Sequence, residues 1–357
     1  MRVLHIDTAT EWRGGQNQIV LTAEEQAARG HEVSIFANAQ GELAARASKF
    51  GLSVHRARVG RGDLSRLTLS ALRQAAHRFQ PEVIHVHESH GLVGAFLAAR
   101  ALHQRPRLVA SRRVDFPLRF ISRLKYARMN KVLAVSEAVC AILIRDGLAH
   151  DKVLVVHEGV KDRPPALGGP QALSSLGVPE GAPLIGNVAQ LVDHKDHATL
   201  LRAAAIVSKT RPECCFLICG DGPLKPDLVS LATALGIAGQ VIFGGFRNDL
   251  DALIPSFDVF CLSSHLEGLG TSVLDAMCFA RPVVATRAGG IPDAVVDGET
   301  GRLVPPRDPE ASAQALLDTL GSSETLRLFG QAGRSRFLQK FTSAAMAEAT
   351  LRAYVFP

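Results

Sequence analysis

The stretch 259–293, VFCLSSHLEGLGTSVLDAMCFARPVVATRAGGIPD, restricts the fold more than any other part of the chain. It contains two short apolar runs, VFCL (259–262) and PVVAT (282–286), and each run is followed by a glycine-containing turn and a predicted helix start. Apolar runs of this length between glycine turns are typical of buried parallel strands, which need helical crossovers. The stretch therefore predicts a doubly wound α/β architecture.

The turn after the first run is predicted to be an anion site. Glu267 lies at the mouth of this turn, Gly270 relaxes its backbone, and Thr271 or Ser272 is expected to cap a helix that ends near Phe279. The first N–H groups of a helix have no intrahelical acceptor, and the helix dipole is positive at that end. A phosphate group would bind well there.

Two carboxylates flank the predicted anion site. Glu267 and Asp275 are eight residues apart, and Thr271 and Asp275 share a helix face that is turned away from the apolar stripe. Carboxylates accept hydrogen bonds from hydroxyl groups. The pattern predicts a ligand that combines phosphate with a polyol.

The alternation of strand, turn and helix runs along the whole chain and is interrupted once. The segment 161–183 is rich in proline, glycine and serine, and the apolar run LIGNV (184–188) starts the same architecture again after it. We expect an N-terminal Rossmann-like domain over 1–163, a linker over 164–182, a C-terminal Rossmann-like domain over 183–340 and a separate helix over 341–357.

Several classes of protein are disfavoured by the sequence. A GxGxxG fingerprint is missing after the first predicted strand, where Gly14 and Gly15 stand alone, so a nicotinamide or flavin enzyme is not expected. The net charge of +6 is diffuse and does not indicate nucleic acid. The six cysteines form no CxxC pair, which favours buried thiols in a reducing compartment. The sequence has neither a signal-peptide core nor a membrane-length apolar run, so a cytoplasmic protein is expected.

The motifs E267-x7-D275 and RPVVATRAGGIPD (281–293) resemble the donor-sugar signature of the retaining family 4, or group 1, glycosyltransferases. The resemblance extends over nearly the whole chain. It implies the GT-B fold, in which two doubly wound Rossmann-like domains face a central cleft and a C-terminal helix crosses back to the N-terminal domain. It also implies transfer of a sugar from a nucleotide-diphosphate sugar with retention at the anomeric carbon, and no metal or other cofactor.

The resemblance assigns roles to individual residues. Glu267 would contact the transferred sugar, Asp275 the ribose, and Lys195 the donor diphosphate. The residues with implied catalytic roles are Glu267, Lys195 and Arg113. The residues with implied donor-binding roles are Gly15, Gln16, Gln190, Gly220, Arg247, Leu269, Gly270, Thr271 and Asp275.

The chain departs from the family pattern at two positions, where the family has an arginine and a histidine. Gln190 stands where the family has an arginine that binds the diphosphate, and Arg113 stands where many relatives have the histidine of a T-x-H motif. Loss of one charged hydrogen bond to phosphate would weaken donor binding about tenfold unless another cation replaces it. Arg113, Arg247 and Arg287 are the candidate replacements.

Histidines cluster at the end of the predicted strand VIHVH (83–87). His85, His87 and His90 are a candidate metal set, although Glu88 is the one carboxylate close to them in sequence. The resemblance instead places His87 or Glu88 on the acceptor side of the active site.

The segment Pro117–Lys131 alternates basic and apolar residues at helical spacing. It fits a basic amphipathic helix that lies on an anionic membrane surface, and it equally fits a solvated surface helix of the first domain. The resulting hypothesis is a cytoplasmic transferase that can contact the inner face of a membrane.

The expected function is sugar transfer to a glycan or lipid-linked acceptor, in the synthesis of cell-envelope polysaccharide or lipopolysaccharide. Two alternatives stay open at this point. A GT-B nucleotide-sugar epimerase would need no acceptor, and a non-catalytic nucleotide-sugar-binding protein would show no turnover.

Overall fold

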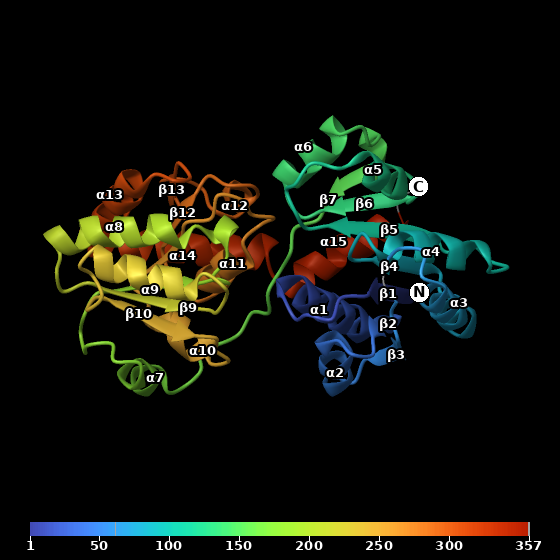
Figure 1. The fold of residues 1–357 in the computed structure, drawn as a ribbon, viewed down its shortest axis with the longest axis horizontal. Coiled ribbons are helices and arrows are strands. Elements are labelled where there is room, and N and C mark those ends of the chain that lie inside the picture. The colour runs from blue at the N-terminus through green and yellow to red at the C-terminus, as the bar shows by residue number, and fades with distance from the viewer. Residues whose placement is uncertain (61, 356–357) are drawn as a thin grey trace. The chain divides into compact units, whose positions relative to one another are not determined.

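The computed structural model describes residues 1–60 and 62–355 (Figure 1). Residues 61 and 356–357, which belong to the predicted first domain and the predicted C-terminal helix, lie outside the described residues. The chain divides into two compact units, 1–161 with 342–357, and 162–341. Each unit is built on its own parallel sheet, so the predicted architecture of two Rossmann-like domains is confirmed.

Within the described residues, the first unit contains a seven-stranded parallel sheet in the order β3-β2-β1-β4-β5-β6-β7. The strands are β1 (Arg2–Asp7), β2 (Glu32–Asn38), β3 (Ser53–Ala57), β4 (Val83–Val86), β5 (Arg107–Arg112), β6 (Lys131–Ala134) and β7 (Val153–Val155). The helices are α1 (Gly14–Ala28), α2 (Glu42–Lys49), α3 (Arg66–Phe79), α4 (Gly91–Arg100), α5 (Phe120–Ala127), α6 (Glu137–Arg145), the short η1 (His150–Lys152) and α15 (Ser343–Val355).

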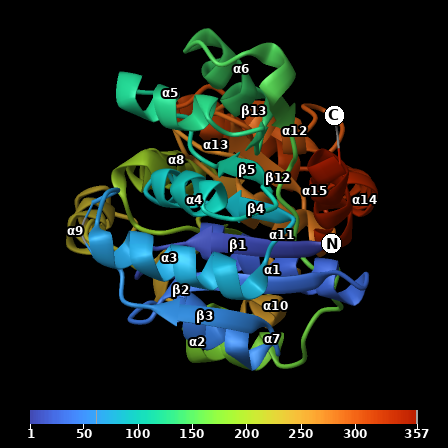
Figure 2. The same cartoon turned by 90° about the vertical axis from the view of Figure 1, so that its right-hand side faces the viewer.

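Both faces of the first sheet are covered by helices. Figure 2 shows these helices packed around the strands. Apolar side chains of α3, α4 and α6 form one core with the strands, and those of α1 and α2 form a second core. The C-terminal helix α15 packs beside α1, and its residues Ala353 and Tyr354 are buried against Val3, Val83 and Val109. A helix that is distant in sequence therefore belongs to the core of the first unit.

Within the described residues, the second unit contains a six-stranded parallel sheet in the order β10-β9-β8-β11-β12-β13. The strands are β8 (Leu184–Val188), β9 (Cys215–Cys219), β10 (Val241–Gly245), β11 (Val259–Leu262), β12 (Val283–Thr286) and β13 (Gly301–Val304). The helices are α7 (Gly169–Ser175), η2 (Asp193–Lys195), α8 (His197–Thr210), α9 (Lys225–Ala234), α10 (Leu250–Leu253), η3 (Ile254–Ser256), α11 (Thr271–Cys278), α12 (Ile291–Ala294), α13 (Pro309–Leu320) and α14 (Ser323–Lys340).

The segment 164–182, expected from its composition to be a linker, is part of the second unit. It contains α7, which packs on α10 and η3, and the Ala166 amide donates to the Asp251 carbonyl at 2.9 Å. Gly169 approaches the carbonyl of Ala252 so closely that an added Cβ would lie 2.6 Å from it. Most side chains of this segment are nevertheless exposed, and Gly169 is the residue that needs close packing.

All six cysteines are free thiols, and five of them are buried, as expected from their apolar surroundings in the sequence. Among the described residues, none of the helices combines the length and the apolar character that a bilayer crossing requires.

Candidate active site

The sheet order of the second unit places its first exit loops next to each other. β8 lies beside β11, and the chain winds outward in opposite directions from these two strands. Ligands of open parallel sheets collect outside the carboxyl ends of the strands at such a switch point. The loop after β8 carries Gln190 and Lys195, and the loop after β11 carries Glu267.

Lys195 and Glu267 form an ion pair at this switch point. The Lys195 ammonium donates to Oε2 of Glu267, and the Ser264 hydroxyl donates to the same oxygen at 3.1 Å. The Ser263 hydroxyl donates to the carbonyls of Lys195 and Asp196 at 3.0 and 2.9 Å, which ties the two loops together. Two residues with predicted catalytic roles, 72 positions apart in the chain, are thereby in contact.

Helix α11 begins next to this pair. The helix starts at Thr271, and Gly270 caps it in a left-handed conformation with φ +86°, so the predicted cap at Thr271 or Ser272 is wrong. An L side chain is strained at that φ, whereas glycine adopts it freely. An added Cβ at Gly270 would lie 3.5 Å from Cγ of Glu267, which places the helix start and the acid side by side. Leu269 has a buried side chain, so a ligand can use its backbone alone.

Asp275 is engaged by an arginine that the sequence pattern did not single out. The Arg163 guanidinium donates to Oδ1 of Asp275 at 2.7 Å and to Oδ1 of Asp251 at 2.6 Å. Burial raises the pKa of Asp275, and the positive charge of Arg163 opposes that rise. Any hydroxyl that binds Asp275 therefore has to share this carboxylate with Arg163.

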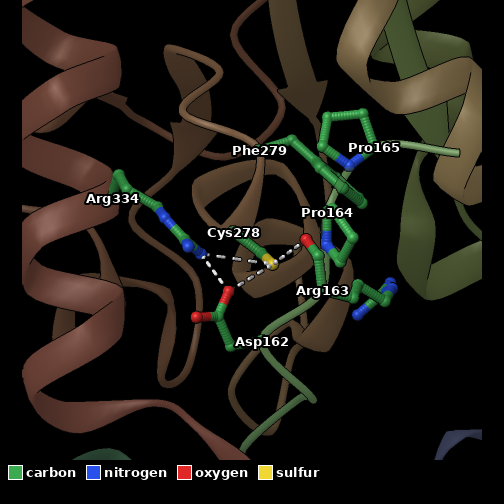
Figure 3. Close-up of a pocket in the computed structure, with 7 residues that line it drawn as sticks. All are labelled: Asp162, Arg163, Pro164, Pro165, Cys278, Phe279 and Arg334. Atoms are coloured by element: carbon green, nitrogen blue, oxygen red, sulfur yellow. Dashed lines mark hydrogen bonds and ion pairs between the residues drawn. The ribbon is translucent and has the colours of Figure 1, made fainter.

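The segment that contains Arg163 also lines a pocket of about 370 Å³ (Figure 3). Arg334 pairs with Asp162 at 2.6 Å and approaches Sγ of Cys278 at 3.5 Å, while the Arg163 guanidinium lies over the ring of Phe279. Asp162 and Arg163 follow Lys161, where the chain first leaves the first unit. These contacts fix the start of the second unit to the end of α11.

Gln190 and Gly220 lie on adjacent loops. Gln190 is exposed, and Gly220, at the end of β9, has φ +147°. The Gly220 amide donates to the Gly245 carbonyl at 2.7 Å, and an added Cβ at Gly220 would lie 1.9 Å from the Ala189 carbonyl oxygen. The glycine allows the exits of β8 and β9 to approach each other.

Each candidate replacement for the missing arginine at position 190 is paired with a carboxylate. Nε and Nη2 of Arg247 both donate to Asp249. Arg287 donates to Asp297 at 2.5 Å, and Arg113 donates to Glu158 at 2.8 Å. The carboxylate partly neutralises the charge of each arginine. To bind the diphosphate of the sugar donor, the arginine would have to share its guanidinium with the diphosphate or release the carboxylate.

The first unit has its own switch point, between β1 and β4. Asp7 ends β1 and accepts from Nε2 of Gln16 at 3.2 Å, while Glu88 follows β4 and accepts from the Thr8 hydroxyl at 2.9 Å. Burial raises the pKa of both acids, and for Glu88 the nearby charge of Asp7 adds to the rise. Gly15 stands beside Arg113, with 3.6 Å between a built Cβ and the arginine Cδ. The predicted residues of the first unit thus gather at one sheet edge.

His85 and His87 meet a third histidine that the sequence analysis missed. His5 lies opposite His85 in the pairing of β1 with β4, and the ligand atoms of the three buried rings lie within 4.8 Å of one another. His90, the third member of the predicted metal set, instead pairs with Asp63 at 2.8 Å on the surface. The pairing of β1 with β4 would have been needed to predict His5, because His5 contacts the other histidines only when these two strands are adjacent.

The pH dependence of stability should report on His197, which lies two residues after Lys195. Burial lowers the pKa of His197 from 6.5 to about 4, and its Nε2 is 3.1 Å from Oδ1 of Asn187. The unfolded chain binds a proton between pH 6.5 and 4 that the folded chain does not bind. The stabilising contribution is therefore fully present above pH 6.5 and decreases by up to about 1.4 kcal/mol per pH unit as the pH falls toward 4.

Urea denaturation at several pH values between 7 and 4 would measure this effect. The free energy of unfolding should decline less steeply in His197→Asn than in the wild type, because all other titrating groups are common to both proteins. Equal slopes in the two proteins would show that His197 titrates normally in the folded state.

Two family models match successive parts of the chain. The model described as glycosyl transferases group 1 matches residues 171–336, and the model described as Glycosyltransferase Family 4 matches residues 12–163. Together these two matches account for most of both units.

Curated relatives match parts of the chain. Lipopolysaccharide core biosynthesis glycosyltransferase LpsE of Rhizobium meliloti is 30% identical over 179 residues, which are 50% of this chain and 52% of LpsE. Alpha-maltose-1-phosphate synthase of Mycolicibacterium smegmatis is 30% identical over 255 residues, which are 66% of this chain and 65% of that enzyme. The chain spans about half to just under two thirds of the length of these relatives.

Solved structures match nearly the whole chain at the level of the fold. Anabaena HepE, solved in complex with UDP and glucose, aligns with a TM-score of 0.86 and 20% identity over 98% of each chain. Its fold is that of this chain, with the same two Rossmann-like domains. The two family models, which together match most of the chain, show that it belongs to the group 1, or family 4, glycosyltransferases, and the likeness to HepE shows the GT-B fold.

Proposed function

We propose that the protein transfers a sugar from a nucleotide-diphosphate sugar to a glycan or lipid-linked acceptor, with retention at the anomeric carbon. The observation that carries the proposal is the contact of Lys195 with Glu267 beside the start of α11. An ammonium, a helix N-terminus and a carboxylate meet at the switch point of a parallel sheet. That combination suits a diphosphate joined to a sugar.

The reaction would begin with an exchange of partners. In the free protein the Lys195 charge is balanced by Glu267. A bound diphosphate would take up the Lys195 ammonium and the N–H groups at Gly270 and Thr271, which leaves Glu267 to accept from a sugar hydroxyl. As the glycosidic bond breaks, negative charge grows on the departing diphosphate, and the fixed positive groups stabilise it.

The proposed setting is the synthesis of cell-envelope polysaccharide, since LpsE is described as a lipopolysaccharide core glycosyltransferase. HepE was solved with UDP and glucose, so UDP-sugars come first in a donor panel that also includes GDP- and ADP-sugars. Because Lys195 and α11 supply positive charge at the diphosphate, we expect turnover to persist in EDTA.

Release of nucleoside diphosphate in the presence of lipid or oligosaccharide acceptors tests the proposal. Proton NMR of the product should show the same anomeric configuration as the donor. Release of an isomerised nucleotide sugar without acceptor would instead support the epimerase alternative. Binding without turnover, unchanged in Glu267→Ala, would favour a non-catalytic binding protein.

The role proposed for Asp275 is to bind the donor ribose. Asp275→Asn should raise the donor KM about tenfold, because a neutral amide accepts hydroxyl hydrogen bonds less strongly than a carboxylate. The matched control is Asp251→Asn, which removes the other carboxylate partner of Arg163 and lies outside α11. Equal increases in KM for the two variants would show that Asp275 acts only through Arg163.

A peripheral membrane contact is proposed for the surface around α5. Phe120 and Ile121 are 66% and 67% exposed, and Phe116 before the helix is 49% exposed. Arginines and lysines surround them in the segment 117–131. Exposed apolar side chains with a basic fringe fit the interface of an anionic bilayer.

Sedimentation with phosphatidylglycerol vesicles would test this contact. Ile121→Asp should reduce the bound fraction several-fold, whereas Leu328→Asp, a change at an exposed leucine on α14 of the second unit, should not. Equal binding of Ile121→Asp and the wild type would assign α5 to a solvated surface.

A further inference from the structure

The three buried histidines of the first unit belong to one hydrogen-bonded loop that starts at Arg113. Nη2 of Arg113 is 3.0 Å from Nδ1 of His87, and Nε2 of His87 is 2.8 Å from Nδ1 of His5. Nε2 of His5 is 2.9 Å from Oε1 of Gln26 on α1. The chain of contacts passes from the exit of β5 through β4 and β1 to the first helix.

The loop then returns through the C-terminal helix. Nε2 of Gln26 donates to the Tyr354 hydroxyl at 3.3 Å, and that hydroxyl lies 2.7 Å from Nδ1 of His85. Nε2 of His85 is 2.8 Å from the Ser111 hydroxyl. Ser111 is two residues from Arg113, so the backbone of 111–113, and not a further hydrogen bond, joins the two ends of the series.

One donor-only group sets the direction of the hydrogen bonds from Arg113 as far as Gln26. A guanidinium can donate but not accept, so Nδ1 of His87 must be the acceptor and the ring proton of a neutral His87 must be on Nε2. That proton makes Nδ1 of His5 an acceptor, which places the His5 proton on Nε2, directed at the Gln26 carbonyl oxygen. The Gln26 amide then donates to Tyr354, and the tyrosine proton is available for Nδ1 of His85.

The three histidines are poorly suited to hold a metal ion, because their ring nitrogens are already hydrogen-bonded. All six ring nitrogens of His5, His85 and His87 have a protein partner within 3.0 Å. A metal ion bound to one nitrogen of each ring would have to displace at least two of these hydrogen bonds and would lie near the charge of Arg113. The histidines are better explained as neutral links in the loop.

We propose that this hydrogen-bonded series positions Arg113. The three histidines are held in it as neutral Nε2–H tautomers, and Tyr354 of the C-terminal helix links Gln26 to His85. The inference rests on the proposed function and deepens it, because the family resemblance implies a catalytic role for Arg113. The other anchor of Arg113 is Glu158, which accepts from Nε at 2.8 Å. His87 and Glu158 together fix both edges of the guanidinium.

Protonation of a histidine would open the loop. A charged His87 has no acceptor at Nδ1, so it would repel the guanidinium instead of binding it. Burial lowers the pKa of His5 to about 4 and holds the pKa of His87 well below its usual range, which keeps both rings neutral at physiological pH. The charged side chains around the loop include Arg113, Glu158, Asp7 at the end of β1, Glu88 after β4, and Arg107, which donates to the Tyr354 carbonyl at 3.1 Å.

Nitrogen-15 NMR of labelled histidine tests the tautomers directly. At pH 7.5 the wild type should show an unprotonated Nδ1 and a protonated Nε2 for His5, His85 and His87. Arg113→Met removes the donor-only group and should give mixed tautomers at His87 and His5. Arg113→Lys restores a donor and should return the wild-type pattern.

The neighbouring arginine supplies the matched control. Arg112→Met changes a guanidinium that donates to the Phe116 carbonyl and not to a histidine, so it should leave all three tautomers unchanged. A Nδ1–H or charged form of any of the three histidines in the wild type would overturn the proposal. An unchanged pattern in Arg113→Met, or zinc binding that shifts the ring nitrogens, would also overturn it.

Tyr354→Phe tests positioning, because Tyr354 does not touch Arg113. Loss of the hydroxyl leaves Nδ1 of His85 without its donor and should make exchange of the Arg113 Nη2 protons, which bind His87, with water about tenfold faster. The acid limb of the kcat profile should also move to higher pH, since His85 becomes easier to protonate. Unchanged proton exchange in Tyr354→Phe would show that the series does not position Arg113 and would contradict the proposal.

The two NMR readouts need no substrate. A wild-type protein that shows the expected tautomers and proton exchange but transfers no sugar would contradict the proposed function and leave the loop established. A protein that transfers sugar but shows other tautomers would contradict the loop alone.

Discussion

Replacing Lys195 by methionine is expected to lower kcat by about 100- to 1000-fold, the usual effect of removing one group that stabilises transition-state charge. Lys195 is the cation in contact with Glu267, and it lies beside the start of α11. Methionine keeps the apolar stem and removes the ammonium. The departing diphosphate would then be stabilised by the helix N-terminus alone.

The experiment needs a lysine control and a folding control. Lys209→Met changes an exposed lysine near the end of α8 and should leave kcat within about twofold of the wild type, as expected of an isolated surface charge. Circular dichroism and the unfolding midpoint should show that Lys195→Met is folded. A folded variant with the wild-type kcat would remove Lys195 from the mechanism.

Gly220→Ala is expected to lower the free energy of unfolding by about 3 to 5 kcal/mol, because overpacking and backbone strain add at one position. A Cβ there would lie 1.9 Å from the Ala189 carbonyl oxygen and 2.8 Å from its carbon. Both are backbone atoms, so no side chain can rotate away. The φ of +147° also strains any L residue.

Gly239→Ala is the matched control for Gly220→Ala. Nothing lies within 4 Å of a built Cβ at Gly239, so the free energy of unfolding should change by less than about 1 kcal/mol. Urea denaturation of both variants measures the difference. A Gly220→Ala protein as stable as Gly239→Ala would show that the loops after β8 and β9 do not pack as described.

The fold could be predicted from local signals because those signals agree along the chain. Short apolar runs between glycine turns predicted parallel strands, and β11 and β12 occupy nearly the residues that the sequence indicated. The end of α11 near Phe279 was also predicted. Composition alone predicted a linker at 164–182, but it did not reveal α7, whose contacts with α10 make the segment part of the second unit.

The candidate site could be predicted only in part, because its remaining members are defined by spatial neighbours. Lys195 and Glu267 carry recognisable motifs, and the structure brings them together. Arg163 lies outside every motif, and its importance comes from contact with Asp275 across 112 positions. Tyr354 reaches His85 only because α15 packs against the first sheet.

The most direct test of the account is where a nucleoside diphosphate binds. UDP, GDP and ADP would be compared by thermal stabilisation, and the strongest would be titrated into deuterated, amide-labelled protein. If the diphosphate binds at the start of α11, the largest backbone amide shifts should fall at Gly270, Thr271 and Ser272. Lys195→Met should weaken binding about tenfold or more. Shifts confined to other segments, with the start of α11 unchanged, would contradict the account.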